Sequence, residues 1–444
     1  MSILSEPAIG PQIRDMKYTS PPYMHDVLPV EPPKDGWLHV ARWQAVERVF
    51  RELCRQFGYK EIRTPIMEAT ELFTRSIGEG TDIVSKEMFT FEDRGGRSRT
   101  LRPEGTAPVI RACLENSLLQ DGAVTKLYYV MRMYRYERGQ KGRYREHQQT
   151  GIEAFGSLDP ALDAEVISLA MEFYHRLGIS GAELRINSVG CPKCRPAYIE
   201  LLKAFVEPLL DHMSGENQRR FRENPLRMLD TKNAKDAELL TGAPSLSGSL
   251  CPECADHFKT LTGHLRALDI AFTVDPGLVR GFDYYTKTAF EIIHPDLGAH
   301  NSIGGGGRYD GLVEECGGPA TPGIGFGIGT ERCLIVLDEL GIELNVGNDS
   351  PVAFIAALGE AARPVAVQLL SDLRRRGIAA DMDYAGKSLK AQMRLAGRLG
   401  AQFALIMGDD EVAESVVGVK DMKEGGEQVT IPLADIGSFL ASRE

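Results

Sequence analysis

Helical periodicity is clearest in two segments of the chain. Between residues 37 and 57, apolar side chains recur at every third or fourth position, and Gly58 follows as a natural C-terminal stop. The second segment begins at Asp159 and Pro160, a capping residue followed by the residue favoured at the first helical position. The pattern therefore predicts helices over residues 37–57 and 160–177.

Short strand-like runs lie between these two helices, at residues 59–65, 87–92, 127–135 and 150–155. Helices that flank several strands without regular strand–helix alternation predict an α+β domain on a largely antiparallel sheet. A further strand is predicted for residues 278–290, in which Arg280 and Phe282 would share one face. An arginine beside the adjacent Tyr284 and Tyr285 is hard to explain as core.

Changes of pattern divide the chain into parts. The first 36 residues are rich in proline and lack a period, which predicts an extended N-terminal arm over 1–36 and a main domain over 37–345. Polar helical stretches and a turn-rich segment predict a mainly helical insertion at about 190–265. Beyond a cluster of Gly, Asn, Asp and Ser, residues 351–444 alternate strands and helices, as in a small α/β domain with a mostly parallel centre.

Composition sets the class of protein. The 444 residues are 43% hydrophobic and 25% charged, as expected of a soluble globular protein with two or three domains. No apolar run is long enough to span a bilayer and no secretion signal is evident, so we expect a cytoplasmic protein without membrane association.

The chain has a net charge of -11, but its basic residues are concentrated in one segment. Between Lys126 and Arg145 there are seven basic residues and one acid, Glu137. Such a stripe suits an enzyme that holds polyphosphate or RNA at one site, although a solvated charged face is the ordinary alternative.

Four of the eight cysteines form two CxxC pairs, Cys191 with Cys194 and Cys251 with Cys254. Two such pairs can present four thiolates to one tetrahedral zinc ion. Four reduced thiols without a metal and a redox pair are the alternatives. A zinc ion held here would be structural, because four thiolates close its coordination shell.

Two further segments carry candidate phosphate chemistry. Residues 134–145 form a basic loop between predicted antiparallel strands, and guanidinium groups can contact two phosphate oxygens at once. Residues 323–337 alternate glycine with apolar residues and then become helical, which leaves one strand face bare and puts Arg332 in the first helical turn. Close helix–strand packing with a solvated arginine is the alternative for Arg332, and a flexible surface loop is the alternative for the glycine run at 304–307.

Together these segments resemble the class II aminoacyl-tRNA synthetases, and among them the histidyl-tRNA synthetase family. Residues 59–68 resemble the first motif of the class, which lies at a dimer interface, while 134–145 and 323–337 resemble the second and third motifs. The segments 101–107, 278–290 and 304–311 resemble sequences of the histidine-specific members, and the resemblance covers nearly all of residues 20–440. It implies a class II synthetase catalytic core with a C-terminal α/β anticodon-binding domain.

The resemblance also implies an activity and its residues. The family joins L-histidine to ATP, with Mg2+, to form histidyl-adenylate, and then transfers the histidyl group to the 3′ end of tRNA(His). By their matched positions, Arg135, Arg280 and Arg332 are the implied catalytic residues, and Arg135, Glu137, Arg143 and Arg332 bind ATP. The implied histidine-binding residues are Glu104, Gly105, Thr106, Arg135, Gln149, Glu153, Arg280, Tyr284 and Tyr285. For Glu153, a salt bridge with a nearby arginine is the alternative.

In the C-terminal domain, Lys387, Lys390 and Arg394 are candidates for contacts with tRNA phosphates, unless they form a solvated helix face. A homodimer is implied by the family, whereas structural Zn2+ is not. The chain departs from the family pattern at Gly139, where proline is common, and at 145–149, where Arg-Glu-His replaces the usual aromatic-His ending. The rival hypotheses are a non-catalytic relative that acts as the regulatory subunit of ATP-phosphoribosyltransferase, and a zinc-dependent RNA-binding protein.

Overall fold

A computed structural model describes residues 18–443 except 31, 33–34, 79–80, 121, 138, 140, 232, 296–301, 348–349 and 423–426. Residues 1–17 of the predicted N-terminal arm, and Arg138 of the basic loop, lie outside this part of the chain. The chain divides into two units, Met1–Val346 and Gly347–Glu444. The described part of the arm has little regular structure apart from a bridge between Leu28 and His39.

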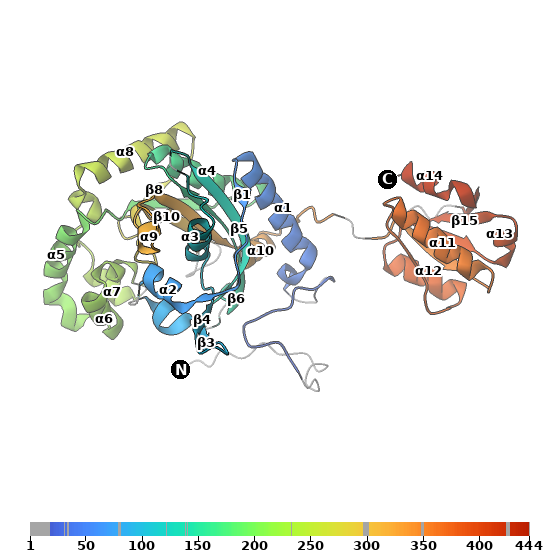
Figure 1. Ribbon diagram of the computed structural model, residues 1–444, viewed down its shortest axis with the longest axis horizontal. Helices are drawn as coiled ribbons and strands as arrows, with labels where there is room; N and C mark the ends of the chain where they lie inside the picture. Colours follow the sequence, from blue (N-terminus) through green and yellow to red (C-terminus); the bar gives the residue numbers. More distant parts are fainter. Residues whose placement is uncertain are drawn as a thin grey trace. The chain divides into compact units, whose positions relative to one another are not determined.

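The first unit is built on an eight-stranded sheet in the order β1-β5-β6-β11-β10-β9-β7-β8 (Figure 1). Its strands are β1 (Lys60–Glu61), β5 (Thr125–Tyr134), β6 (Glu146–Phe155), β7 (Glu183–Ser188), β8 (Thr273–Val274), β9 (Thr286–Ile293), β10 (Ser302–Arg308) and β11 (Gly323–Gly329). All neighbours are antiparallel except the two edge pairs, β1 with β5 and β7 with β8. The predicted α+β architecture on a largely antiparallel sheet is therefore confirmed.

Helices cover one face of this sheet and form the larger core. They are α1 (Val40–Gln56), α4 (Pro160–Arg176), α8 (Pro252–Ala267) and α10 (Thr330–Glu339), with η1 (Gly36–Leu38) before α1. The two predicted helices are confirmed as α1 and α4. Asp159 caps α4 by accepting a hydrogen bond from the amide of Ala161 at 2.9 Å, and Gly58 takes a positive φ of 80° after α1.

The period of two in β11 separates the faces of the sheet. Ile324, Phe326 and Ile328 point into the helix-covered core, whereas the alternate glycines present no side chain to the opposite face. That open face is bordered by α3 (Thr106–Glu115), α5 (Arg195–Val206) and α9 (Leu312–Glu315), whose apolar residues join the second core. Beside it lie α2 (Thr70–Ile77), the π-helical turn η2 (Ile83–Glu87) and a small sheet of β2 (Met67–Ala69), β3 (Phe89–Glu92) and β4 (Ser98–Leu101).

The region between β7 and β9 is mainly helical, and its helices run along one side of the first unit (Figure 1). After α5 come η3 (Glu207–His212), α6 (Gly215–Glu223), η4 (Pro225–Asp230), α7 (Ala234–Leu239), η5 (Leu246–Ser249) and then α8. Helix α8 returns the chain to the sheet, because Leu261 and Leu265 pack into the larger core.

The prediction of one strand over 278–290 is wrong for its first half, because β9 begins only at Thr286. Side chains of the inserted region fix the preceding loop instead. Arg227 donates to the carbonyl of Gly281, and the Asn224 amide donates to Asp283 at 2.7 Å. Asp283, for which the sequence suggests no role, thus ties this loop to the inserted region.

The second unit has a five-stranded sheet in the order β13-β12-β14-β15-β16. Its strands are β12 (Ala353–Ala357), β13 (Ala380–Met382), β14 (Phe403–Met407), β15 (Val416–Asp421) and β16 (Val429–Pro432). The pairs of β12 with β13 and β14 are parallel, which confirms the predicted parallel centre. Its helices are α11 (Ala362–Arg375), α12 (Leu389–Arg398), α13 (Asp409–Ala413), η7 (Leu433–Asp435) and α14 (Ile436–Ala441).

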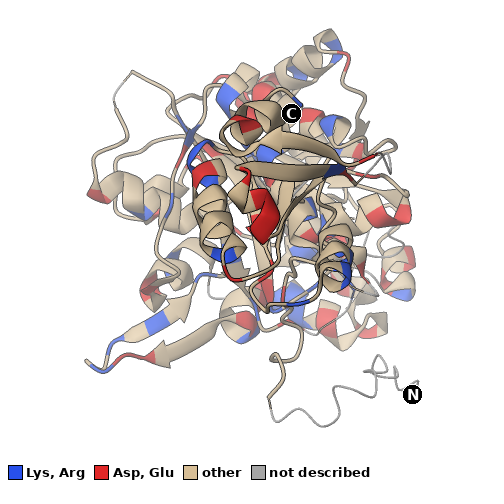
Figure 2. Ribbon diagram, turned by 90° about the vertical axis from the view of Figure 1, so that its right-hand side faces the viewer, with Lys and Arg blue, Asp and Glu red and all other residues tan. Residues whose placement is uncertain are grey.

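Lys and Arg are interspersed with Asp and Glu on the helices and loops in Figure 2, rather than gathered in one large field. Within the described residues, no helix has the length and hydropathy needed to cross a membrane.

Candidate active site

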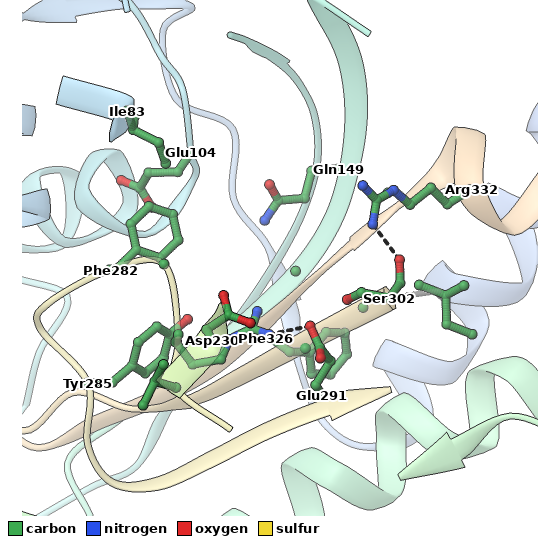
Figure 3. A pocket seen from close by; sticks show the side chains of 18 of the residues that line it. Ile83, Glu104, Gln149, Asp230, Phe282, Tyr285, Glu291, Ser302, Phe326 and Arg332 are labelled. Atoms are coloured by element: carbon green, nitrogen blue, oxygen red, sulfur yellow. Dashed lines mark hydrogen bonds and ion pairs between the residues drawn. The ribbon is translucent and has the colours of Figure 1, made fainter. Parts of the chain in front are cut away.

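The open face of the eight-stranded sheet borders a cavity of about 570 Å³. Figure 3 shows Glu104, Phe282 and Tyr285 toward one end and Arg332 with Ser302 toward the other. The predicted site residues that line the cavity are Glu104, Thr106, Arg135, Glu137, Arg143, Gln149, Arg280, Tyr284, Tyr285 and Arg332. Gly105 and Glu153 are not among the lining residues, and lie behind them.

Glu104 sits at the N-terminus of α3. Its carboxylate accepts hydrogen bonds from the backbone amides of Thr106 at 2.6 Å and Ala107 at 2.9 Å. These two donors and the positive end of the helix favour a carboxylate here, although burial raises the pKa of Glu104. Gly105 is required beside it, because a Cβ at this position would lie 2.5 Å from the ring of Tyr129.

Glu153 lies beneath the cavity floor and is bonded by hydroxyl groups. Thr106 Oγ1 donates to Glu153 Oε1 at 2.8 Å, Tyr309 donates to Oε2, and the Tyr129 hydroxyl lies 3.4 Å from Oε1. These partners replace the salt bridge considered as an alternative. Burial raises the pKa of Glu153 to about 8, so the group is mostly protonated near neutral pH. Glu153 therefore fixes the hydroxyls of residues that line the cavity.

The bare faces of the glycines in β11 are occupied by side chains of β6. A Cβ on Gly325 would overlap the carboxylate of Glu153, and one on Gly327 would overlap the amide of Gln149. Gln149 Nε2 in turn donates to the Tyr129 hydroxyl at 3.0 Å. The alternating glycines thus make room for two of the predicted histidine-binding residues.

Tyr284 and Tyr285 are buried side by side, with ring centroids 4.7 Å apart. Phe282 stacks on Tyr284 at 5.1 Å, and Tyr309 meets it edge to face at 5.8 Å. Burial raises the pKa of both tyrosines, so their hydroxyls stay protonated and can donate hydrogen bonds.

Four charged residues extend along the cavity toward its other end, beginning with Arg135, whose Nε donates to the carbonyl of Pro103 at 2.7 Å. Arg332 donates through Nε to the carbonyl of Gly142 at 2.9 Å and through Nη1 to that of Ser302. Glu137 lies between Arg143 and Arg135, at 3.4 and 3.8 Å. Burial, followed by the charge of Arg143, lowers the pKa of Arg332. Three neighbouring guanidinium groups with one carboxylate leave an excess of positive charge that suits a polyphosphate.

Arg280 lies on the cavity floor. Its Nη1 is 3.2 Å from Glu291 Oε1, and its guanidinium covers the bare face of Gly305. Its Nε is buried and has no hydrogen-bond partner among the described groups. Arg280 thus retains donors that can serve a ligand.

Tyr129, Glu291 and Tyr309 also line the cavity, although they were not predicted as site residues from the sequence. Glu291 is the one carboxylate of strand β9, and Tyr309 lies two residues after the glycine run, so both carried a signal. Tyr129 resembles an ordinary core residue of an apolar strand, and only its position opposite Gly151 across β6 reveals its place in the site.

The basic stripe of residues 126–145 does not act as one patch. Lys126 pairs with Glu165 at 2.7 Å, Arg132 lies 4.8 Å from the Trp43 ring, and Arg145 lies 3.8 Å from the Tyr136 ring. Among the described arginines of the stripe, Arg135 and Arg143 line the cavity. Most of the stripe therefore serves local packing.

The four cysteines of the CxxC pairs converge, and their sulfur atoms all lie within 4.8 Å of one another. The Sγ–Sγ distances are 3.7 Å for Cys191–Cys194, 3.8 Å for Cys191–Cys251 and 3.9 Å for Cys194–Cys254. Zn–S bonds of about 2.3 Å in a tetrahedron place the sulfurs about 3.8 Å apart, so these residues fit a zinc ion.

An antiparallel sheet whose open face receives arginines from a strand–loop–strand and from a strand–helix defines a class II aminoacyl-tRNA synthetase. A model of the histidyl-tRNA synthetase family matches residues 38–333, and a model of the anticodon binding domain matches residues 352–443. The chain belongs to the histidyl-tRNA synthetase family and is thus a ligase specific for histidine.

Individual relatives agree over nearly the whole chain. The chain is 50% identical over 428 residues to histidine–tRNA ligase of Desulforamulus reducens. The aligned region covers 96% of this chain and 100% of that protein. It is 51% identical to the Moorella thermoacetica enzyme of the same name, covering 93% and 96% of the two chains. The structure of apo S. aureus histidyl-tRNA synthetase superposes with a TM-score of 0.78 at 38% identity, covering 95% and 99%. These matches disfavour the regulatory-subunit hypothesis.

Proposed function

We propose that the cavity binds L-histidine and ATP side by side and forms histidyl-adenylate. The observation that carries this assignment is that one cavity is lined by Arg135, Arg280 and Arg332 together with the Glu104–Thr106 segment and the two tyrosines. The cationic end suits the phosphates, and the end with carboxylate and phenol groups suits an amino acid with two ring nitrogens.

In the first step a carboxylate oxygen of histidine attacks the α-phosphorus of ATP. A bond forms between that oxygen and phosphorus, the bond from the α-phosphorus to the bridging oxygen breaks, and pyrophosphate leaves. Arg280 and Arg135 stabilise the charge on the α-phosphate, and Arg332 holds the γ-phosphate with help from Arg143. In the second step a ribose hydroxyl at the 3′ end of tRNA(His) takes the histidyl group, and AMP leaves.

Histidine is selected by hydrogen bonds that other amino acids cannot satisfy. Glu104 and Gln149 offer oxygens to the ammonium group, while Tyr284 and Tyr285 offer hydroxyls to the imidazole. Glu153 orients Thr106 and Tyr309 from behind. An amino acid without ring nitrogens would leave these buried groups unpaired, which penalises its binding.

Metal ions have two proposed places. Mg2+ would accompany ATP, and the carboxylates of Glu137 and Glu291 in the cavity lining would supply oxygen ligands for it. The ion would neutralise charge on the phosphates. The four cysteines hold a structural Zn2+.

The second unit is proposed to hold tRNA. Lys387, Lys390 and Arg394 are exposed in and before α12, where phosphates can reach them. We further propose that the chain acts as a homodimer in the cytoplasm, as the family resemblance implies.

The decisive experiment is ATP–pyrophosphate exchange with each standard amino acid. We expect exchange with histidine alone, and exchange that does not depend on histidine would contradict the proposal. Aminoacylation of tRNA(His) then tests the second step. Arg97→Ala, an arginine whose side chain is 70% exposed, is the matched control for arginine variants of the cavity.

A further inference from the structure

The first pair of cysteines is attached directly to the start of β9. Val189 and Gly190 connect the end of β7 to Cys191, and both form backbone hydrogen bonds with Lys287. The amide of Val189 donates to the carbonyl of Lys287 at 2.8 Å, and the amide of Lys287 donates to the carbonyl of Gly190 at 2.7 Å. The position of Cys191 is thereby coupled to the backbone two residues after Tyr285.

Arg195 makes a second connection between this pair and the tyrosines. It follows Cys194 and begins α5. Its Nε donates to the carbonyl of Val189 at 3.2 Å, and its Nη2 donates to the carbonyl of Tyr285. One side chain therefore joins the cysteine pair to the backbone of a residue that lines the cavity.

The second pair of cysteines, at the start of α8, is also connected to Lys287. Glu253, between Cys251 and Cys254, lies 3.1 Å from the ammonium group of Lys287, which also contacts Asp310 at 3.4 Å. Lys287 is 6% exposed and has a left-handed φ of 50°. A lysine keeps such a conformation only when its surroundings hold it, and both cysteine pairs contribute to that hold.

We propose that a zinc ion bound by Cys191, Cys194, Cys251 and Cys254 positions Tyr284 and Tyr285 for histidine by clamping the inserted region to the start of β9. The inference rests on the proposed function of the tyrosines. Without the metal, the two pairs are joined by weak thiol contacts, by the exposed ion pair of Lys193 with Glu253 at 3.4 Å and by the contacts of Lys287, so α5 and α8 are held together less firmly. Arg195 and Lys287 then lose their fixed places, and the tyrosine backbone loses its support. Arg195 is a positioning residue, since it acts through the backbone of Tyr285.

Two variants separate the metal from its connection to the site. Cys251→Ser removes one zinc ligand at a partly exposed position, and Cys316→Ser is its matched control, a partly exposed cysteine outside the cluster. Arg195→Met leaves the four ligands in place and removes the connection to Tyr285. The measurements are zinc per chain by elemental analysis, L-histidine affinity by equilibrium dialysis, and KM for histidine and for ATP in pyrophosphate exchange.

The unmodified protein is expected to contain about one zinc ion per chain. Cys251→Ser is expected to lose the zinc and to weaken histidine binding about tenfold, while KM for ATP changes less than about twofold. Arg195→Met keeps the zinc and shows the same selective loss, and Arg195→Lys recovers part of it. Cys316→Ser behaves like the unmodified protein.

Three results would overturn the inference: far less than stoichiometric zinc in the unmodified protein, unchanged histidine affinity in zinc-free Cys251→Ser, or unchanged histidine affinity in Arg195→Met. The third measurement stands even where Cys251→Ser does not fold. Failure of the proposed function is distinguishable from all three, because it appears as absence of histidine-dependent exchange in the unmodified, zinc-loaded protein.

Discussion

Arg280 is held against Glu291 on the cavity floor, with Nη1 and Oε1 3.2 Å apart. Strand pairing sets this relationship, because Glu291 in β9 lies opposite Gly305 in β10 and the guanidinium lies over that glycine. A Cβ at residue 305 would lie 2.8 Å from Nη1. The ion pair fixes the direction of Arg280 while leaving other donors for a phosphate oxygen.

Arg280→Ala is expected to slow adenylate formation far more than it weakens histidine binding. Donors aimed at charge that develops in the transition state contribute on the order of 10²- to 10³-fold to kcat. Pyrophosphate exchange with varied histidine measures kcat and KM separately, and Arg97→Ala provides the baseline. Equal losses in both parameters would instead indicate a role in binding.

Gly327→Ala is expected to impair histidine binding by displacing Gln149. The added methyl group would overlap the Gln149 amide, which also bonds to Tyr129. We expect a KM for histidine raised by roughly tenfold, comparable to the loss of about one hydrogen bond in a buried site. Pyrophosphate exchange gives this value.

Gly263→Ala is the matched control for Gly327→Ala, because a Cβ at this exposed position of α8 would have no neighbour within 4 Å. It should leave KM unchanged and stabilise the helix by up to about 1 kcal/mol. A normal KM in Gly327→Ala would show that the bare face of β11 is not needed for the site.

Regular periodicity explains which parts of the fold could be predicted. Helix α4 has both a capping residue and a helical period, and β11 alternates glycine with apolar residues, so local sequence determines each. The segment at 278–285 was assigned to a strand because its local pattern allows one. Its conformation instead depends on Asn224 and Arg227, which are far away in sequence and join it only in the folded chain.

In the candidate site, too, some residues could be predicted from local sequence, whereas others depend on contacts made only in the folded chain. Motif resemblance identified Arg135, Arg280 and Arg332, and all three line the cavity. The contacts of Glu153 with Thr106 and Tyr309 required the register of the sheet, which no single segment contains. The convergence of the two cysteine pairs likewise depends on how α5 and α8 pack.

Glu153→Gln should make stability less dependent on pH. Burial raises the pKa of this carboxyl from 4.5 to about 8, so between these values the folded state holds a proton that the unfolded state has released. The free energy of unfolding of the unmodified protein therefore falls as pH rises through this window, by an amount on the order of a few kcal/mol.

The amide cannot ionise, so this contribution is absent from the variant. Urea unfolding at about pH 6 and about pH 9 measures the slope in each protein, and the variant is expected to lose less stability between the two. Parallel pH dependences would mean that Glu153 does not titrate in this range.

Arg308→Met is expected to destabilise the first unit strongly. Arg308 and Asp163 are both fully buried, their closest contact joins β10 to α4, and Thr288 donates to the same carboxylate at 2.5 Å. Loss of the arginine leaves a buried carboxylate without its charge partner, which costs about 3–5 kcal/mol. Urea unfolding measures this loss.

Arg375→Met is the control for loss of an exposed ion pair, because Arg375 pairs with Asp372 at 3.2 Å on the surface. A change of less than about 1 kcal/mol is expected there. A second substitution, Asp163→Leu, should recover part of the stability lost in Arg308→Met, since it removes the uncompensated charge. No recovery would show that the loss came from packing rather than from charge.

Substitution of Lys387, Lys390 and Arg394 by alanine together is expected to raise KM for tRNA(His) and leave pyrophosphate exchange unchanged. The three side chains are exposed in the second unit, whereas the cavity lies in the first. Each phosphate contact that is lost should lower the slope of log affinity against log salt by about 0.7–0.9.

Aminoacylation at several salt concentrations therefore separates phosphate contacts from contacts with bases, which alter affinity with little change in slope. Arg375→Ala, another exposed arginine of the second unit, is the control for a general loss of positive charge. If the control and the triple variant lost tRNA affinity in proportion to the charge removed, the basic residues before and within α12 would act only through the net field. A loss confined to the triple variant, with a reduced salt slope, would place the tRNA backbone along this helix.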